Sequence, residues 1–505
     1  MAKIEEKATR QIGALSRIGQ STWGIHVEDM CQLVISTLLP KMLYACTTWF
    51  IPDGGFGYKT REDYVLERLG ALQHKALVAV SGAFRTTARA ALEVDLNMLP
   101  IELLLHKTIT ASLLRIRATP LWQNIKDIRD TAPVNRRNAT FRSPLHKLEC
   151  LVGEKLGKKV LPTLEEQVPA TAVVPPWQVP PAIHVAPDRE QAIKEHNEVL
   201  ANIAAEEQDS DGLTIEKEQL IVYTDGSEIS SEVGSAAVAP KHGWKNAAYM
   251  GNNTVSNVYA AELLGVHMAL AMAVRHGGGQ RFKKVWVFTD NQAAILSTYR
   301  PRAQSGQYIL RRIWDQYTEL TEQGVEVEIR WIPSHEGVPG NEQADDLAKR
   351  AAGWRPAPGN KNGVVAAAYR AAQLEWVKCL KSACKRKYKL VTSAWWLKNW
   401  QSGTTGREYY KIANAPSKGL LAARNKVPKA LGSIITQMRT GKIGLRSYLR
   451  KINRADTDEC ECGRGTQTVR HVITECPNFS ELRHELFRRD EPCRDMKKVI
   501  GEDTV

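Results

Sequence analysis

The sequence predicts an α/β protein in which a mixed sheet flanked by helices lies between a helical N-terminal region and a basic, helical C-terminal region. Three observations support this fold class. Apolar residues recur at helical spacing through residues 1–125, strand and helix patterns alternate through residues 217–353, and a basic helical pattern follows. The predicted regions are residues 1–129, 130–216, 217–353 and 354–505.

The composition is that of a soluble globular protein with several domains. The chain has 505 residues, of which 43% are hydrophobic and 25% are charged. The N-terminus, MAKIEEKATRQIGALS, lacks the apolar core of a secretory signal, and no apolar run approaches the ~20 residues of a membrane helix. Nine scattered cysteines indicate reduced thiols. We therefore expect an intracellular protein, nuclear or cytoplasmic and not secreted, with no membrane partner.

Positive charge is concentrated at the C-terminal end of the chain. Residues 354–505 carry 30 Lys and Arg against 14 Asp and Glu, whereas residues 217–353 carry 14 against 15. A basic region of this kind is typical of a protein that binds a polyanion such as nucleic acid. A solvated basic surface without a partner gives the same charge count, so charge alone does not decide between them.

The regions before residue 217 have two different patterns. Residues 26–50 and 64–84 are amphipathic at helical spacing, and PDGGFG (52–57) predicts a loop between them. The segment VPATAVVPPWQVPPAIHVAP predicts an extended, semi-rigid connector because it is rich in proline. An acidic helix, DREQAIKEHNEVLANIAAEEQ, is expected to follow this connector.

Residues 217–353 alternate between strand and helix patterns, which predicts a mixed sheet with helices on its faces. The predicted strands are residues 219–225, 234–239, 284–289 and 326–332, and the predicted helices are residues 257–276, 291–298, 305–323 and 342–352.

Four acidic residues in this region share a context. Asp225 ends an apolar strand in IVYTDGS, Asp290 ends another in VWVFTDNQAA, Glu262 lies in the helix NVYAAELLGV, and Asp345 follows IPSHEGVPGNEQA. Each has an ordinary explanation: a turn residue, a solvated helix residue, or an acid that complements a helix dipole. Asn341 is the expected N-cap of the last helix, which would place Asp345 in its first turns.

The four carboxylates together favour a metal site. The carboxyl ends of neighbouring strands open into a common crevice, where several carboxylates would repel one another. Hard cations such as Mg²⁺ or Mn²⁺ relieve that repulsion. Two such ions about 4 Å apart can activate a water molecule and stabilise the leaving oxygen of a phosphodiester. His335, in a loop rich in Gly and Pro, could carry protons because histidine titrates near neutrality.

The segments YTDGS, AAELLGV, FTDNQAA and IPSHEGVPGNEQADDLAKRAA together resemble type 1 ribonuclease H, in that family's order. The resemblance implies a ribonuclease H-like fold and Mg²⁺-dependent cleavage of the RNA strand in RNA–DNA hybrids. It assigns the metal ligands to Asp225, Glu262, Asp290 and Asp345 and the loop histidine to His335. Between Asp290 and the strand at residues 326–332, the sequence shows no basic extension that could grip the substrate. We therefore expect hybrid binding to depend on flanking basic segments. An integrase-like transferase shares the fold, but the Glu262 helix and the SHEGVPGNEQAD segment argue against it.

A second cluster lies near the C-terminus. CECGRGTQTVRHVITECPNF places Cys460, Cys462, His471 and Cys476 in a C-x-C-x8-H-x4-C arrangement. Three thiolates and an imidazole suit a tetrahedral structural Zn²⁺, and the predicted module is zinc-knuckle-like. Buried thiols beside a helix histidine are the alternative.

The sequence around this cluster resembles the tail of polyproteins from fungal LINE-like (non-LTR) retrotransposons. The N-terminal segments STWGIHVEDMCQLVISTLLPKMLYACTTWF and QHKALVAVSGAFRTTARAALEVDLNMLPIELLL resemble the region after the reverse transcriptase palm of such elements. The palm's Tyr/Phe-x-Asp-Asp signature is absent from the chain, so polymerase activity is not expected, and a separate reverse transcriptase polypeptide is a candidate partner. A catalytically silent, nucleic-acid-binding relic or partner subunit is the alternative to an active enzyme.

Overall fold

The computed structural model describes residues 1–50, 61–131, 144–157, 160–208, 217–357, 359–422, 424, 427–487 and 495–501. Its contacts divide the chain into two compact units. Unit 1 combines Met1–Ser112, Ser143–Leu148 and Lys389–Val505, and unit 2 combines Leu113–Arg142 and Glu149–Tyr388. The first and last parts of the chain therefore fold together in unit 1, and each unit is described by itself.

Unit 2 contains the predicted mixed sheet. Its six strands follow the order β1-β6-β5-β2-β3-β4. β2, β3 and β4 are antiparallel neighbours, whereas β5, β6 and β1 add in parallel beside β2. The strands are β1 (Ala182–His184), β2 (Glu218–Ile229), β3 (Glu232–Ala239), β4 (Trp244–Asn252), β5 (Phe282–Thr289) and β6 (Glu326–Trp331). β1 and β4 were not predicted from the sequence.

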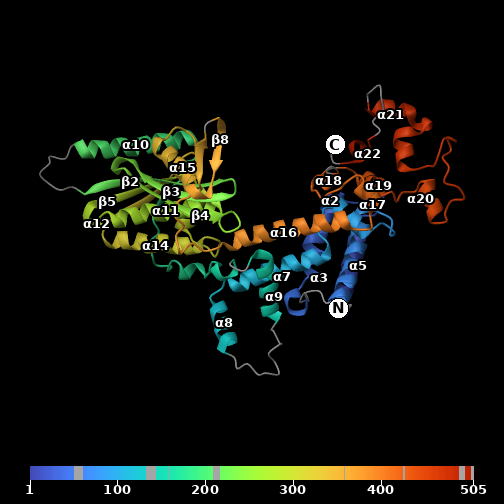
Figure 1. Cartoon of the computed structure of the whole chain (residues 1–505), viewed down its shortest axis with the longest axis horizontal. Helices are drawn as coiled ribbons and strands as arrows, with labels where there is room; N and C mark the ends of the chain where they lie inside the picture. Colours follow the sequence, from blue (N-terminus) through green and yellow to red (C-terminus); the bar gives the residue numbers. More distant parts are fainter. Residues whose placement is uncertain are drawn as a thin grey trace. The chain divides into compact units, whose positions relative to one another are not determined.

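Helices cover both faces of the sheet (Figure 1). α11 and α14 bury one face, and apolar residues of β2 such as Leu220 and Val222 pack in that core. α10 and α15 cover the other face, where Tyr223 and Phe288 pack. β5 has apolar side chains on both faces because helices cover both of its sides. The covering helices are α10 (Arg189–Gln208), α11 (Val258–Arg275), α13 (Gln292–Tyr299), α14 (Gln307–Glu322) and α15 (Pro339–Ala351).

The helix predictions in this domain are confirmed, with one correction. α15 begins at Pro339 and its N-cap is Val338, so Asn341 is not the N-cap. Proline is favoured at the first helical position because its φ angle is already helical and its missing N–H needs no partner there. Asn341 therefore lies inside the first turn, where it is buried.

The proline-rich connector is tied to unit 2 rather than extended away from it. The Gln167 N–H donates to the Ala118 carbonyl at 2.6 Å, and the Val168 N–H donates to the Gln307 side chain at 2.8 Å. β1 then joins the sheet beside β6. The predicted acidic helix is confirmed as α10, whose Val199 packs into the core of the α15-side face.

Unit 2 also contains α8 (Leu121–Thr131), α12 (Gly278–Arg281) and a hairpin of β7 (Trp354–Ala357) and β8 (Asn360–Val365). α9 (Pro144–Leu156) is divided between the units, with residues 144–148 in unit 1 and the rest in unit 2. α16 (Lys381–Ser402) begins in this unit, and its later residues belong to unit 1.

Unit 1 is built from helices, as the sequence predicts for both ends of the chain. The N-terminal helices are α1 (Ala2–Ser16), α2 (Val27–Leu33), α3 (Leu39–Met42), α4 (Cys46–Trp49), α5 (Arg61–Ser81), α6 (Arg89–Asp95) and α7 (Ile101–Arg117). The C-terminal helices are α17 (Arg407–Tyr410), α18 (Gly419–Ala422), α19 (Lys429–Thr440), α20 (Arg446–Lys451), α21 (Ser480–Phe487) and α22 (Met496–Ile500). The predicted loop at residues 52–57 lies outside the described residues.

The helix predicted at residues 26–50 is broken into pieces. A π-helical turn at Val34–Leu38 separates α2 from α3, and Ala45 has a left-handed φ of 50° before α4. Local periodicity could indicate the apolar face but not these interruptions.

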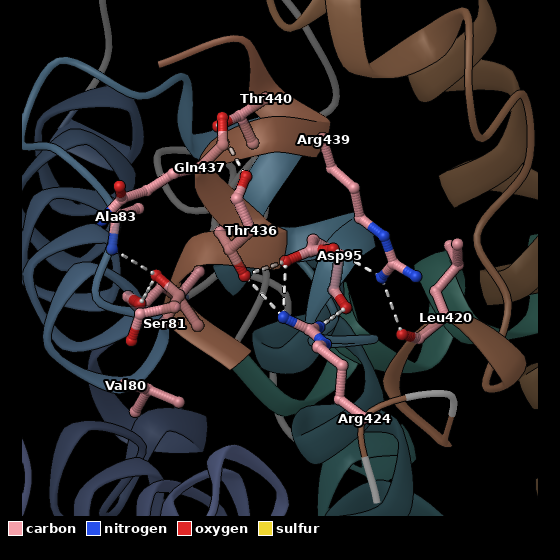
Figure 2. Close-up of polar contacts among 12 residues, drawn as sticks. Val80, Ser81, Ala83, Asp95, Leu420, Arg424, Thr436, Gln437, Arg439 and Thr440 are labelled. Atoms are coloured by element: carbon pink, nitrogen blue, oxygen red, sulfur yellow. Dashed lines mark hydrogen bonds and ion pairs between the residues drawn. The ribbon is translucent and has the colours of Figure 1, made fainter. Parts of the chain in front are cut away.

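A buried charge cluster joins the two sequence halves of unit 1 (Figure 2). Asp95 at the end of α6 pairs with Arg424 at 3.0 Å and with Arg439 on α19 at 3.3 Å, and all three side chains are at most 2% exposed. Thr436 and Tyr409 donate further hydrogen bonds to the Asp95 carboxylate at 2.8 and 3.0 Å. Burial opposes ionisation, but the two guanidinium charges outweigh it and hold the pKa of Asp95 below its ordinary value.

Two helical stretches are long and apolar enough to cross a membrane by length and composition, contrary to the sequence prediction that no apolar run approaches that length. They are Val27–Trp49 and Val258–Arg275. The second is α11, and 67% of its apolar window is buried in the unit 2 core. The corresponding figure for the first is 39%, and its buried side chains, such as Met30 and Met42, are part of the unit 1 core.

Candidate functional site

Three of the four predicted carboxylates converge at one end of the parallel strands in unit 2. Asp225 lies on β2, Asp290 directly follows β5, and Glu262 lies in the second turn of α11. One carboxylate oxygen from each lies within 4.8 Å of the others. α11 is fixed at this place because Asn257 caps it, accepting a hydrogen bond from the Ala260 N–H at 2.9 Å. The predicted convergence is therefore present in the structure.

The three carboxylates lie in an environment that disfavours their charge. Asp225 and Glu262 are 6% and 3% exposed. Burial, followed by the charges of Asp290 and Asp345, raises the pKa of Asp225 to about 7. Burial, followed by the charges of Asp225 and Asp290, raises the pKa of Glu262 well above its ordinary value. Two acidic groups this close are expensive to ionise unless a cation shares the site.

Glu262 and Asp225 have few compensating contacts. Thr289 Oγ1 donates a hydrogen bond to Glu262 Oε2 at 3.4 Å. The backbone N–H of Gly226 donates to both carboxylates, which lowers their pKa values against the effect of burial. Asp225 Oδ2 is buried and has no hydrogen-bond partner among the described residues. A buried carboxylate oxygen without a partner is unusual in a folded protein and is a candidate ligand atom for a cation.

Asp345 lies near this group but belongs to a different contact. Among the described residues it is not part of the set within 4.8 Å, although its charge raises the pKa values of Asp225 and Asp290. Its Oδ2 accepts from Lys349 Nζ at 2.6 Å, one helical turn later on α15. Sequence reasoning missed Lys349, although its i+4 spacing from Asp345 is the usual signal for such a pair. The neighbouring Asp346 pairs with Arg350 at 2.7 Å, and both side chains are 47% exposed.

His335 lies in the loop between β6 and α15. It is exposed and has a left-handed φ of 57°. Burial raises the pKa of Asp290, while a hydrogen bond from Ser334 and the charge of His335 act against that rise. The loop therefore brings the imidazole close enough to influence the carboxylates electrostatically, and Ser334 is a contact that the sequence did not indicate.

Trp331 fixes the backbone beside Asp290. Its indole N–H donates to the Asp290 carbonyl at 3.0 Å, and the Ile332 N–H donates to the Thr289 carbonyl at 3.1 Å. These two bonds extend the β5–β6 pairing to the residue that carries the carboxylate. The position of Asp290 is therefore set by the sheet rather than by a free loop.

Gly226 allows α11 to approach β2 closely enough to place Glu262. A Cβ atom at residue 226 would lie 2.6 Å from the Glu262 nitrogen and 2.8 Å from the Ala261 carbonyl carbon. Because both are backbone atoms of a packed helix, that contact can be relieved only by moving α11.

Gly226→Ala should therefore destabilise unit 2 by about 1–3 kcal/mol, the usual range for overpacking. Urea unfolding of the full chain measures this change. Gly444→Ala is the control because a Cβ atom there meets nothing within 4 Å, and its effect should stay within about 0.5 kcal/mol. An equal effect of both substitutions would contradict the close approach of α11.

The predicted Cys/His cluster is also assembled, in unit 1. One ligand atom from each of Cys460, Cys462, His471 and Cys476 lies within 4.8 Å of the others. Cys460 and Cys476 Sγ are 3.8 Å apart, which matches the separation of about 3.8 Å between two thiolates at 2.3 Å from a tetrahedral zinc. Cys462 Sγ is 3.2 Å from His471 Nε2.

The surroundings act differently on the thiols of the cluster, since desolvation raises the pKa of Cys476 above its ordinary value. Desolvation opposes ionisation of Cys462, but hydrogen bonds from the Arg464 N–H and His471 outweigh it and lower its pKa to about 7. His471 Nδ1 lies 3.8 Å from Glu475 Oε2, on the side away from the thiols. A carboxylate on the far ring nitrogen orients a histidine ligand toward a metal.

A model of the RNase H family matches residues 217–353, the interval that carries the carboxylates. RNase H1 from the halophilic archaeon Halobacterium salinarum NRC-1 is 22% identical over 26% of this chain and 96% of that chain, with a TM-score of 0.20. The N-terminal RNase H domain of rv2228c from Mycobacterium tuberculosis is 20% identical over 26% of this chain and 93% of that chain, with a TM-score of 0.22. Because the family match spans the strands and helices that hold Asp225, Glu262 and Asp290, residues 217–353 are an RNase H domain.

Proposed function

We propose that the chain is an endonuclease that hydrolyses the RNA strand of RNA–DNA hybrids with two divalent metal ions. The observation that carries the proposal is the convergence of Asp225, Glu262 and Asp290 at the end of the strands of an RNase H domain. Their burial and mutual repulsion make a set of oxygen donors that is costly without a cation.

The residues present fit Mg²⁺ or Mn²⁺. All the donors are carboxylate oxygens, which these hard cations prefer, and Asp225 Oδ2 is buried without a hydrogen-bond partner among the described residues. Asp225, Glu262 and Asp290 would hold the metal, and Asp345 would join them in place of its contact with Lys349. When bound, the metal supplies Lewis acidity toward water and toward a phosphodiester.

The protein's own groups position the reaction and handle its proton. Trp331 and the β5–β6 pairing hold Asp290, and Asn257 holds the helix that carries Glu262. His335, exposed at the edge of the site, can exchange a proton with solvent as the leaving oxygen departs. Lys349 supplies a positive charge that lowers the pKa of Asp225 against the effect of burial.

Incubation of the purified chain with an end-labelled RNA–DNA hybrid tests this function. Cleavage of the RNA strand with Mg²⁺, and its loss with EDTA, would support the proposal. Binding of the hybrid without cleavage at any concentration of Mg²⁺ or Mn²⁺ would favour the alternative, a silent nucleic-acid-binding relic or partner subunit.

We further propose that Cys460, Cys462, His471 and Cys476 bind a structural zinc ion and that the chain derives from a LINE-like retrotransposon. The zinc proposal is supported by the convergence of the four ligand atoms. The proposed origin is supported by the sequence resemblance of both ends of the chain, and it makes a separate reverse transcriptase a candidate partner.

The zinc proposal predicts one equivalent of zinc per chain in protein purified without chelator. Cys460→Ser should lose most of that zinc because a hydroxyl is a far weaker zinc ligand than a thiolate. Elemental analysis by mass spectrometry measures the content. Cys150→Ser, which replaces a cysteine outside the cluster, is the matched control and should keep its zinc. Equal zinc content in both variants, or no zinc in the parent, would favour the alternative that the cluster is a set of buried thiols beside a histidine.

A further inference from the structure

The beginning of α16 lies against the end of α11 that leads to the carboxylates. The Leu380 N–H donates to the Val255 carbonyl at 2.8 Å, and Asn257 Nδ2 donates to Ser382 Oγ at 3.4 Å. Asn257 is the N-cap of α11, five residues before Glu262, which is about 7–8 Å along a helix. The first turn of α16 is therefore held at the N-cap of α11, less than two helical turns along α11 from Glu262.

Two further contacts hold the same part of α16 on either side. The Ser382 N–H donates to Ser305 Oγ at 3.0 Å, in the loop that joins α13 to α14. Arg386 Nη1 lies 3.7 Å from Glu228 Oε2. Glu228 follows Asp225 by three residues on β2, or about 10 Å along a strand. The first two turns of α16 are thus held between the α13–α14 loop and β2, both of which adjoin the carboxylate site.

This border of the site carries exposed positive charge. Lys385 and Arg386 on α16 are exposed, as are Arg300 and Arg302 in the α13–α14 loop. The ion pair of Arg386 with Glu228 is long and its arginine side chain is 44% exposed, so it contributes little and leaves the guanidinium accessible. We call Arg300, Arg302, Lys385 and Arg386 the basic border.

A nucleic-acid duplex bound at the carboxylates would extend beyond them, and the contacts above place the basic border beside the same site. Duplexes carry about one negative charge per 1.7 Å of axis, so roughly six backbone charges lie along each 10 Å of the duplex. Residues 217–353 have a net charge of about −1 from 14 Lys and Arg and 15 Asp and Glu, which cannot attract such a polyanion by itself. Attraction for the duplex must therefore come from local clusters of positive charge, and the basic border is one such cluster.

We propose that the basic border binds phosphates of the RNA–DNA hybrid beside the scissile bond, so that α16 is part of the substrate-binding surface. The choice of hybrid as ligand rests on the proposed function. The inference places a binding element outside the interval that the family match covers, in the first two turns of a helix that the sequence marked only as basic.

The experiment measures binding of a fluorescent 20-base-pair RNA–DNA hybrid to the full chain carrying Asp225→Asn, in EDTA, from 50 to 300 mM KCl. Neutralising two phosphate contacts with Lys385→Gln and Arg386→Gln should make the negative slope of log affinity against log salt shallower by about 1.8. Affinity at 100 mM KCl should fall by about 10- to 100-fold, as expected from that slope. Arg300→Gln with Arg302→Gln should reduce the slope similarly.

Lys241→Gln with Lys245→Gln is the matched control, since it removes the same charge from exposed residues around the β3–β4 connection. That connection lies at the opposite end of β2, where His242 is 3.7 Å from Glu218. An unchanged slope in both border variants, or an equal reduction in the control, overturns the proposal. Because binding is measured without turnover, a normal border effect in a chain that never cleaves hybrid would sink the proposed function but leave this inference standing.

Discussion

Replacing Asp225 with asparagine is expected to reduce hybrid cleavage by at least about 10³-fold while leaving the fold intact. The substitution replaces a carboxylate ligand with a neutral amide, and the carboxylate's Oδ2 is buried without a partner among the described residues. It also removes the charge of Asp225, which adds to the effect of burial in raising the pKa of Glu262. The metal-free variant should therefore be as stable as the parent or more so, and thermal unfolding in EDTA measures this.

The matched control is Asp346→Asn, which changes an exposed acid on α15 next to Asp345. It should keep cleavage within about twofold of the parent because its ion pair with Arg350 is on the surface. Initial rates on a labelled hybrid at saturating Mg²⁺ compare the two. Full activity of Asp225→Asn would exclude the carboxylate mechanism, and equal loss in both variants would point to a general effect on the fold of the domain.

Replacing Asp95 with alanine is expected to destabilise unit 1 by about 3–5 kcal/mol, the usual cost of removing one partner of a buried ion pair. The side chains of Arg424 and Arg439, which are at most 2% exposed, would then face each other without the carboxylate between them. For a unit of this size the midpoint of thermal unfolding should fall by roughly 6–20 °C. Differential scanning calorimetry of the full chain can follow the transition.

Glu408→Gln provides the comparison, since it breaks an ion pair with Lys411 whose side chains are both 70% exposed. Its effect should lie within about 1 kcal/mol, as for other exposed pairs. The proposed hybrid cleavage by unit 2 offers an internal reference for each variant. A midpoint unchanged by Asp95→Ala would mean that the cluster in Figure 2 does not hold unit 1 together.

The convergence of the carboxylates could be predicted because each lies where local pattern is informative. Apolar strands before Asp225 and Asp290 and an apolar helix around Glu262 bring the three acids to one end of the sheet. The Cys/His cluster could be predicted equally well, since its ligands lie within a stretch of 17 residues. When ligands are close in sequence, their spacing along the chain indicates that their side chains are close in space.

Other features depended on contacts that no local pattern encodes. β1 pairs with β6 across more than 140 residues, so the proline-rich segment gave no sign of joining the sheet. Asp95 and Arg424 are separated by 329 residues, and their burial follows only from packing of the two ends of the chain. The contact of Asp345 with Lys349 was local but competes with the expected role of Asp345 as a metal ligand.

The Asp95 cluster has a consequence for how the chain is made. Asp95 leaves the ribosome long before Arg424 is synthesised, and at 5–20 residues per second the interval is about 15–65 s. During that time the N-terminal helices must wait with an acidic group and apolar surface uncovered, while the RNase H domain can already fold. The N-terminal helices of unit 1 therefore complete this buried ion pair only after the C-terminal helices have been made.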